Sequence, residues 1–129
     1  MMIRTEFAVG ASPDDAWAAI RDVGNVHTRL ARGFVTDCRL DGDVRTVTFV
    51  NGMVVDELVV SVDDAARRVA YSARGGLTRH HHASFEVADG DGGETRIIWT
   101  TDVLPDDAGA GIAAMVDAGV QAITHTLAG

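Results

Sequence analysis

The strongest constraint on the fold is a series of β-branched segments between residues 34 and 103, separated by turn-forming residues at regular intervals. Short strands divided in this way predict an antiparallel meander. The turn signals are Asp41-Gly42, Asn51-Gly52, Asp63-Asp64, Gly75-Gly76 and Asp89–Gly93. The strands expected between them are about Phe34–Leu40, Asp43–Val50, Met53–Val62, Arg68–Ala73, Arg79–Ala88 and Thr95–Val103.

The segment before the meander adds one strand and two short helices. Ile3–Val9 alternates apolar and polar side chains, which indicates a strand with one buried face. Ser12 stands before a proline and three residues ahead of Asp15, a pattern typical of a helix N-terminus. We expect this helix to end near Gly24 and a second short helix to follow at Val26–Ala31.

The segment after Leu104-Pro105 predicts a long amphipathic helix that closes the chain, with Asp106 and Asp107 in its first turn. Gly119 on its inner face implies either close contact with the sheet or room for a ligand. The apolar positions at helical spacing are Ile112, Met115 or Val116, Gly119, Ile123 and Leu127.

This order of elements predicts one α+β domain over residues 1–129 with a helix-grip fold. It consists of a seven-stranded antiparallel curved sheet, two short helices and a long C-terminal helix. So short a chain cannot cover both faces of the sheet, so one face must take the terminal helix. Because strong twist bends the sheet around that helix, we expect a cavity between them.

Three segments resemble one protein family: ASPDDAWAAIRDVGNV, VRTVTFVNGMVVDELVVSVDDAARRVAYSA and GETRIIWTTDVLP. They are similar to the START-like or SRPBCC superfamily, in particular its bacterial polyketide cyclase/dehydrase and lipid-transport-like branch. The resemblance extends over almost the whole chain and implies the helix-grip fold. Members include ligand carriers and aromatase-cyclases, so the resemblance implies no single activity.

Composition limits the partners of the chain. Its formal net charge is -8, and all 11 basic residues are arginines that form no cluster. Such a surface repels phosphate backbones and anionic lipid, so we expect no nucleic-acid partner. No segment approaches the roughly 18 to 20 consecutive apolar residues that span a bilayer, so no membrane insertion is expected. Cys38 is the single cysteine, which favours a reducing, cytoplasmic setting.

One hairpin carries the first candidate polar site. Arg45, Gly52 and Glu57 resemble an arginine, turn glycine and glutamate common in the bacterial branch of the family. A two-residue Asn51-Gly52 loop would place Arg45 opposite Leu58 and make Asp56 the cavity carboxylate. A three-residue loop would instead place Glu57 on the Arg45 face. The sequence leaves both open, as it does acid-base chemistry and a structural ion pair.

A second candidate is the histidine run that follows Arg79. His81 shares a face with Ala83 and Phe85, so it should point inward, while His80 and His82 face outward. An inward histidine could act as a general base near neutral pH. The two outward histidines lack an evident third ligand, so no metal site is predicted.

The remaining site candidates are side chains expected to line the cavity. Trp99 and Thr101 share one face of the last strand, and Tyr71 faces inward from another strand, with core packing as the alternative role. The glycines of GAGIAA at residues 109–114 only superficially resemble a dinucleotide motif, so no cofactor is expected. The predicted ligand-binding residues are Phe49, Tyr71, His81, Phe85, Trp99, Thr101, Met115 and Gly119.

These features support three functional hypotheses. The first is binding of a small hydrophobic or aromatic metabolite in the internal cavity. The second is a polyketide cyclase/dehydrase-like enzyme that uses His81, Arg45 and either Asp56 or Glu57 as catalytic groups. The third is a protein-interaction module, which could form a homodimer.

Overall fold

A computed structural model describes residues 1–75 and 78–129 of the chain. Its strands form one antiparallel sheet and lie within a residue or two of the predicted segments. Gly76, half of one predicted turn, lies outside the described residues. The strands are β1 (Met2–Val9), β2 (Val35–Asp41), β3 (Val44–Phe49), β4 (Val54–Asp63), β5 (Arg68–Arg74), β6 (His80–Asp89) and β7 (Thr95–Leu104).

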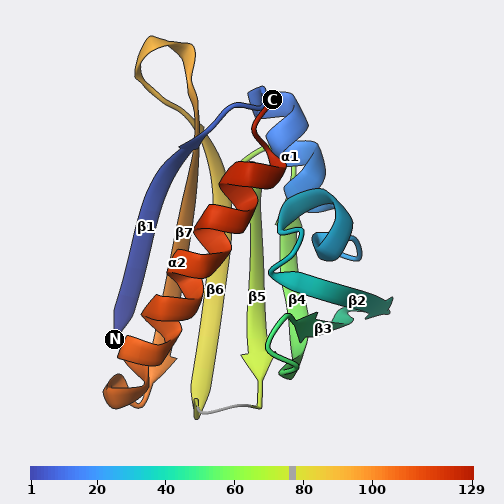
Figure 1. Ribbon diagram of the computed structural model, residues 1–129, viewed down its shortest axis with the longest axis vertical. Coiled ribbons are helices and arrows are strands. Elements are labelled where there is room, and N and C mark those ends of the chain that lie inside the picture. Colours follow the sequence, from blue (N-terminus) through green and yellow to red (C-terminus); the bar gives the residue numbers. More distant parts are fainter. Residues whose placement is uncertain (76–77) are drawn as a thin grey trace.

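The sheet has the order β1-β7-β6-β5-β4-β3-β2, so six strands follow one another as a meander and β1 joins beside the last. Two irregularities in strand pairing increase its curvature. One lies between Val35 and Asp37 in β2 and the other between Val59 and Ser61 in β4. An extra residue in one strand of a pair bends that strand and strengthens the local twist. Figure 1 shows β2 running across the direction of the central strands.

Within the described residues, five helical segments accompany the sheet. Ser12 caps the first of them, because its hydroxyl accepts a hydrogen bond of 3.1 Å from the Asp15 backbone N–H. The next is a single π-helical turn in which the Ala31 N–H donates to the Val26 carbonyl. The segments are α1 (Pro13–Arg21), η1 (Val26–Leu30), η2 (Asp91–Gly93), η3 (Asp106–Ala108) and α2 (Gly109–Thr126).

The start of the terminal helix differs from the prediction. Asp106 and Asp107 lie in the 3-10 segment η3, and α2 begins only at Gly109. The Ala108 N–H donates to the Pro105 carbonyl, which closes the tighter i to i+3 turn before α2 starts. The acidic residues therefore precede the first turn of α2.

The helices cover one face of the sheet and create the interior of the protein. Figure 1 shows α2 running diagonally across this face, with α1 beside its C-terminal end. The Ala11 N–H donates to the Leu127 carbonyl, which joins the start of α1 to the end of α2. The largest fully buried side chains are Ile97, Ile123, Val47, Val69, Val103 and Thr101. The helix-grip fold predicted from the sequence is confirmed.

The length of the turn between β3 and β4 decides whether Asp56 or Glu57 faces the interior. Its loop has three residues, because the Phe49 N–H donates to the Met53 carbonyl across residues 50–52. Gly52 has a φ of 88°, the left-handed conformation that such loops place at their last position. Arg45 therefore pairs with Glu57, and the two-residue-loop register that turns Asp56 inward is wrong.

Candidate functional site

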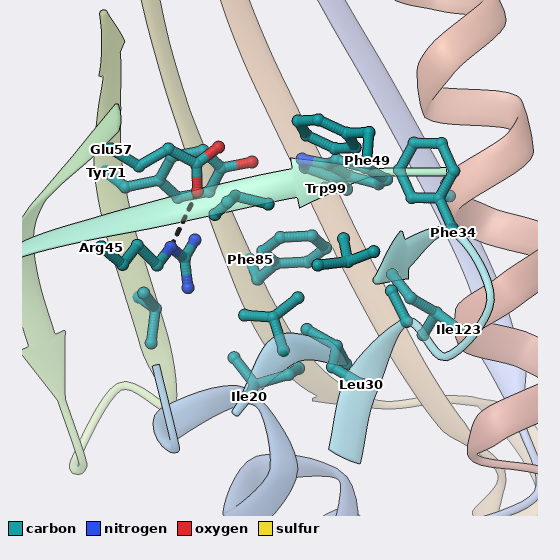
Figure 2. A pocket seen from close by; sticks show the side chains of 16 residues that line it. Ile20, Leu30, Phe34, Arg45, Phe49, Glu57, Tyr71, Phe85, Trp99 and Ile123 are labelled. Atoms are coloured by element: carbon teal, nitrogen blue, oxygen red, sulfur yellow. Dashed lines mark hydrogen bonds and ion pairs between the residues drawn. The ribbon is translucent and has the colours of Figure 1, made fainter. Parts of the chain in front are cut away.

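Two adjoining cavities lie between the helices and the concave face of the sheet. The larger has a volume of about 260 Å³ and extends under α2. The smaller, of about 60 Å³, lies toward α1 and η1 and is shown in Figure 2. Both are bordered by the same five side chains, so the two cavities lie next to each other. These shared residues are Phe34, Phe49, Glu57, Tyr71 and Trp99.

Every residue predicted to bind a ligand borders one cavity or the other. Phe49, Tyr71 and Trp99 border both, His81, Thr101 and Met115 only the larger, and Phe85 and Gly119 only the smaller. Strand register explains this placement, since Phe85 pairs with Trp99, and Tyr71 and Thr101 both pair with Ala83. The structure thus brings the predicted residues together, and their role in ligand binding stays a prediction.

Aromatic rings form a continuous wall at the junction of the cavities. Phe85 stacks on Trp99 with ring centroids 4.5 Å apart and lies 6.2 Å from Tyr71 on its other side. Phe34 and Phe49 meet edge to face at 5.2 Å. Such contacts contribute energy beyond the burial of apolar area and hold the rings in fixed orientations. The wall is therefore a preformed apolar surface.

Gly119 is the position at which α2 packs closely against the ring of Trp99. A Cβ atom added at Gly119 would lie 2.8 Å from two ring carbons of Trp99 and 3.3 Å from a ring carbon of Phe34. The absence of a side chain on α2 thus lets the indole approach the helix backbone. Close contact with the sheet, one of the two readings that the sequence leaves open, is observed, and Gly119 also borders the smaller cavity.

Arg45 and Glu57 form the charged part of the site. The Arg45 Nε donates to Glu57 Oε1 at 2.7 Å, as Figure 2 shows, and both residues are less than one-tenth exposed. A second guanidinium nitrogen donates to the Val23 carbonyl at 3.3 Å, and the guanidinium carbon lies 4.8 Å from the centre of the Tyr71 ring. Arg45 is thereby held in one orientation.

Burial controls the protonation of Glu57. Loss of hydration raises the pKa of this carboxyl group, and the nearby Arg45 charge opposes the rise. Asp56, the alternative carboxylate, is exposed on the opposite face of β4, where it accepts a hydrogen bond of 2.7 Å from the Thr46 hydroxyl. Glu57 is consequently the carboxylate that borders both cavities.

Tyr71 and Trp99 add two neutral polar groups to the site. Burial raises the pKa of the Tyr71 hydroxyl, with Glu57 adding to the rise and Arg45 and Trp99 opposing it. The tyrosine is therefore uncharged at neutral pH. The Trp99 Nε1 is buried beside the Tyr71 hydroxyl, whose pKa a hydrogen bond from Trp99 lowers, although this contact lacks ideal hydrogen-bond geometry.

Of the histidine run, His81 borders the larger cavity. His81 pairs with Val103, borders this cavity and is half-buried, whereas His80 is exposed and pairs with Leu104. Burial lowers the pKa of His81, and its neighbours His80 and His82 lower it further. The His81 imidazole is thus uncharged at neutral pH. Within the described part of the chain, no cluster of His, Cys, Asp or Glu could hold a metal ion.

Several cavity residues escape prediction from the sequence. Phe34 lies just before β2, and it borders both cavities because its carbonyl accepts the Val50 N–H across the sheet edge. This contact joins segments distant in sequence, so no local pattern indicates it. The periodicity of α2 placed its apolar face, and Met115 and Gly119 border the cavities as predicted, but Gly111, Ile112 and Val116 were not among the predicted ligand-binding residues. The other unpredicted residues of the larger cavity include Met53, Val55, Ala73, Gly111, Ile112 and Val116.

The chain was compared with known proteins by sequence and by structure. The model of one protein family, described as polyketide cyclase / dehydrase and lipid transport, matches residues 2–128. No curated protein matches the chain. No helix among residues 1–75 and 78–129 is both long and apolar enough to cross a membrane.

Solved structures share the fold over nearly the full chain. An uncharacterised protein from Bacillus thuringiensis has a TM-score of 0.86 at 17% identity, with 98% of each chain covered. XoxI from Bacillus cereus has a TM-score of 0.85 at 17% identity, covering 98% of this chain and 94% of its own. A protein from Thermobifida fusca has a TM-score of 0.77 at 22% identity, covering 98% of this chain and 90% of its own. At these identities the likeness shows the fold alone.

Proposed function

The chain belongs to the polyketide cyclase / dehydrase and lipid transport family, and from this premise we propose that it binds a small hydrophobic or aromatic metabolite. The observation that carries the proposal is the larger cavity between the sheet and α2, with its preformed wall of aromatic rings. Mostly apolar cavities with a few placed polar groups are the usual binding sites for small molecules.

The size of the cavity limits the ligand. Its volume of about 260 Å³ is slightly below the roughly 300 to 1,000 Å³ typical of sites for drug-sized molecules. A compound of one to three rings suits this volume, whereas a lipid with two acyl chains does not. The cavity also supports ligand binding over the alternative of a protein-interaction module, which needs no internal space.

The proposal is tested by mass spectrometry of protein purified gently from its natural host. Native spectra should contain a species heavier than the chain by the mass of one small molecule, and denaturing spectra should lose it. The extracted compound should bind again to protein from which it has been removed. A chain that retains no compound and binds none from a total metabolite extract would contradict the proposal.

Glu57 supports a second candidate function, cyclase or dehydrase chemistry on the bound molecule. A carboxyl group with a raised pKa that borders both cavities can transfer protons, and Arg45, which borders the smaller cavity, would orient a substrate oxygen that reaches it. His81 is the alternative base. Chemical conversion of the retained compound by the wild-type chain, absent in Glu57→Gln and in His81→Ala, would establish this activity. Intact turnover in both variants would exclude these two groups as the catalysts.

A further inference from the structure

β1 is a free edge of the sheet. It is the outermost strand in the sheet order, and Figure 1 shows no described element beyond its outer side. Free edges can bind another strand through their unpaired backbone groups, so natural sheets protect them with bulges, prolines, charges or covering segments. β1 pairs with β7 without a shift in register and contains no proline, so Arg4 and Glu6 are its only such protection. The other edge strand, β2, has an irregular register and packs against η1.

Alternate residues of β1 direct their backbone N–H and carbonyl groups away from the sheet. Met1 and Val103 exchange both backbone hydrogen bonds, so residue 1 and every second residue after it bond to β7. The backbone groups of the residues between them point outward, and no described residue bonds to them. The side chains of these residues are exposed on the convex face of the sheet. The outward residues are Met2, Arg4, Glu6 and Ala8.

The charges of β1 are complementary to those of a second copy of the same strand. If two copies pair antiparallel about a two-fold axis at Thr5, Arg4 of each copy lies opposite Glu6 of the other. An axis at Arg4 or at Glu6 would instead place like charges opposite each other and weaken the pair. An axis nearer either end of β1 would leave outward residues without a partner. The charges that protect this edge from other strands therefore favour one pairing, that with its own copy.

We propose that β1 is a homodimer interface, in which the β1 strands of two copies pair antiparallel about an axis at Thr5 and join the two sheets into one. Arg4 and Glu6 of each copy exchange backbone hydrogen bonds with Glu6 and Arg4 of the other, and their side chains form ion pairs on the convex face. On the concave face, Ile3 of one copy lies opposite Phe7 of the other, an apolar cross-strand pair. No β1 residue borders either cavity, so the inference does not depend on the proposed function.

The contacts that these charges make within one chain leave the pairing available. Glu6 accepts a hydrogen bond of 3.1 Å from the Arg96 Nε, and a guanidinium nitrogen of Arg4 lies 3.6 Å from the other Glu6 oxygen. Exposed ion pairs of this kind contribute little to stability, so Arg4 can turn to the second copy at small cost. Repulsion between two chains of net charge -8 opposes association, and physiological salt screens it beyond about 8 Å.

Charge reversal across the proposed axis tests the inference in the full chain. Sedimentation velocity of the wild-type chain at increasing concentration should detect a species of twice the 13.6 kDa chain mass. Arg4→Glu and Glu6→Arg each turn both attractive pairs into repulsive ones, so each should weaken self-association at least about tenfold. Mixed in equal amounts, the two variants should form a heterodimer, because every cross-strand charge pair is then attractive again. The matched control is Arg39→Glu, which makes the same charge change on β2 and should associate like the wild-type chain.

Hydrogen exchange locates the interface on β1. In the dimer the backbone amides of Arg4 and Glu6 should be protected, and dilution to the monomer should expose them, while the amides of Thr5 and Phe7 stay bonded to β7 in both states. A wild-type chain that is monomeric up to about 1 mM would overturn the inference. So would a dimer that survives both single charge reversals, a mixture of the two variants that stays monomeric, or a dimer whose Arg4 and Glu6 amides exchange freely.

Discussion

Gly119 provides the sharpest test of how α2 packs on the sheet, through the substitution Gly119→Ala. The added Cβ would meet two Trp99 ring carbons at 2.8 Å, closer than real Cβ contacts come, and Phe34 at 3.3 Å. The ring cannot retreat freely, because Phe85 stacks on Trp99 at 4.5 Å. The methyl group must therefore displace either the indole or the helix.

Two opposing terms set the size of the effect. Alanine in place of glycine favours the helix by about 1 kcal/mol, and forcing a methyl group into a packed interior costs about 1 to 3 kcal/mol. We expect Gly119→Ala to lower the free energy of unfolding by up to about 2 kcal/mol. The matched control is Gly111→Ala in the same helix, where an added Cβ meets nothing within 4 Å. The control should be neutral or stabilised by up to about 1 kcal/mol.

Urea unfolding followed by far-ultraviolet circular dichroism measures both variants. The midpoint should fall for Gly119→Ala and stay or rise for Gly111→Ala, with similar dependence on urea concentration in each case. Equal stabilisation of the two variants would refute the reasoning, since it would mean that α2 does not press on Trp99.

Three more predictions concern other contacts. Glu57→Leu should lower the free energy of unfolding by about 3 to 5 kcal/mol, because Arg45 stays buried without its partner, and adding Arg45→Met should recover most of this loss. Urea unfolding of the single and the double variant measures both changes, and a loss below about 1 kcal/mol in Glu57→Leu would contradict the buried ion pair. The pKa of His81 is lower in the folded chain than its ordinary value of 6.5, so a falling pH protonates this histidine in the unfolded chain first, and the stability of the fold should fall as pH drops below about 6.5. His81→Asn should reduce this pH dependence of the thermal unfolding temperature, and an unchanged pH dependence would refute the role of His81. Ser12→Ala should cost about 1 kcal/mol by removing the cap of α1, and an unaltered urea midpoint would count against that role.

Local patterns in the sequence were sufficient to predict the fold. Alternation in Ile3–Val9, the turn residues of the meander and the cap at Ser12 each depend on neighbours in sequence, and the structure confirms the elements they predict. Inward-facing positions such as Tyr71 and Trp99 followed from strand periodicity. What periodicity could not give was the length of a loop, because one extra residue reverses the faces of every residue after it.

The site depends on contacts that no local pattern encodes. The choice between Asp56 and Glu57 rested on a three-residue loop that Asn51-Gly52 alone does not specify. The close approach of Trp99 to Gly119 appears only when α2 is placed on the sheet. Phe34 enters the cavity through a hydrogen bond between distant segments. Such features require the assembled structure.

The central claim, that the cavity between the sheet and α2 binds the ligand, is tested most directly by filling it. Ala73 borders the larger cavity, while the adjacent Ser72 alternates to the other face of β5. Calorimetric titration with 2-naphthol should detect binding to the wild-type chain and to Ser72→Phe, and no binding to a folded Ala73→Phe. Equal binding by the two variants would contradict the account.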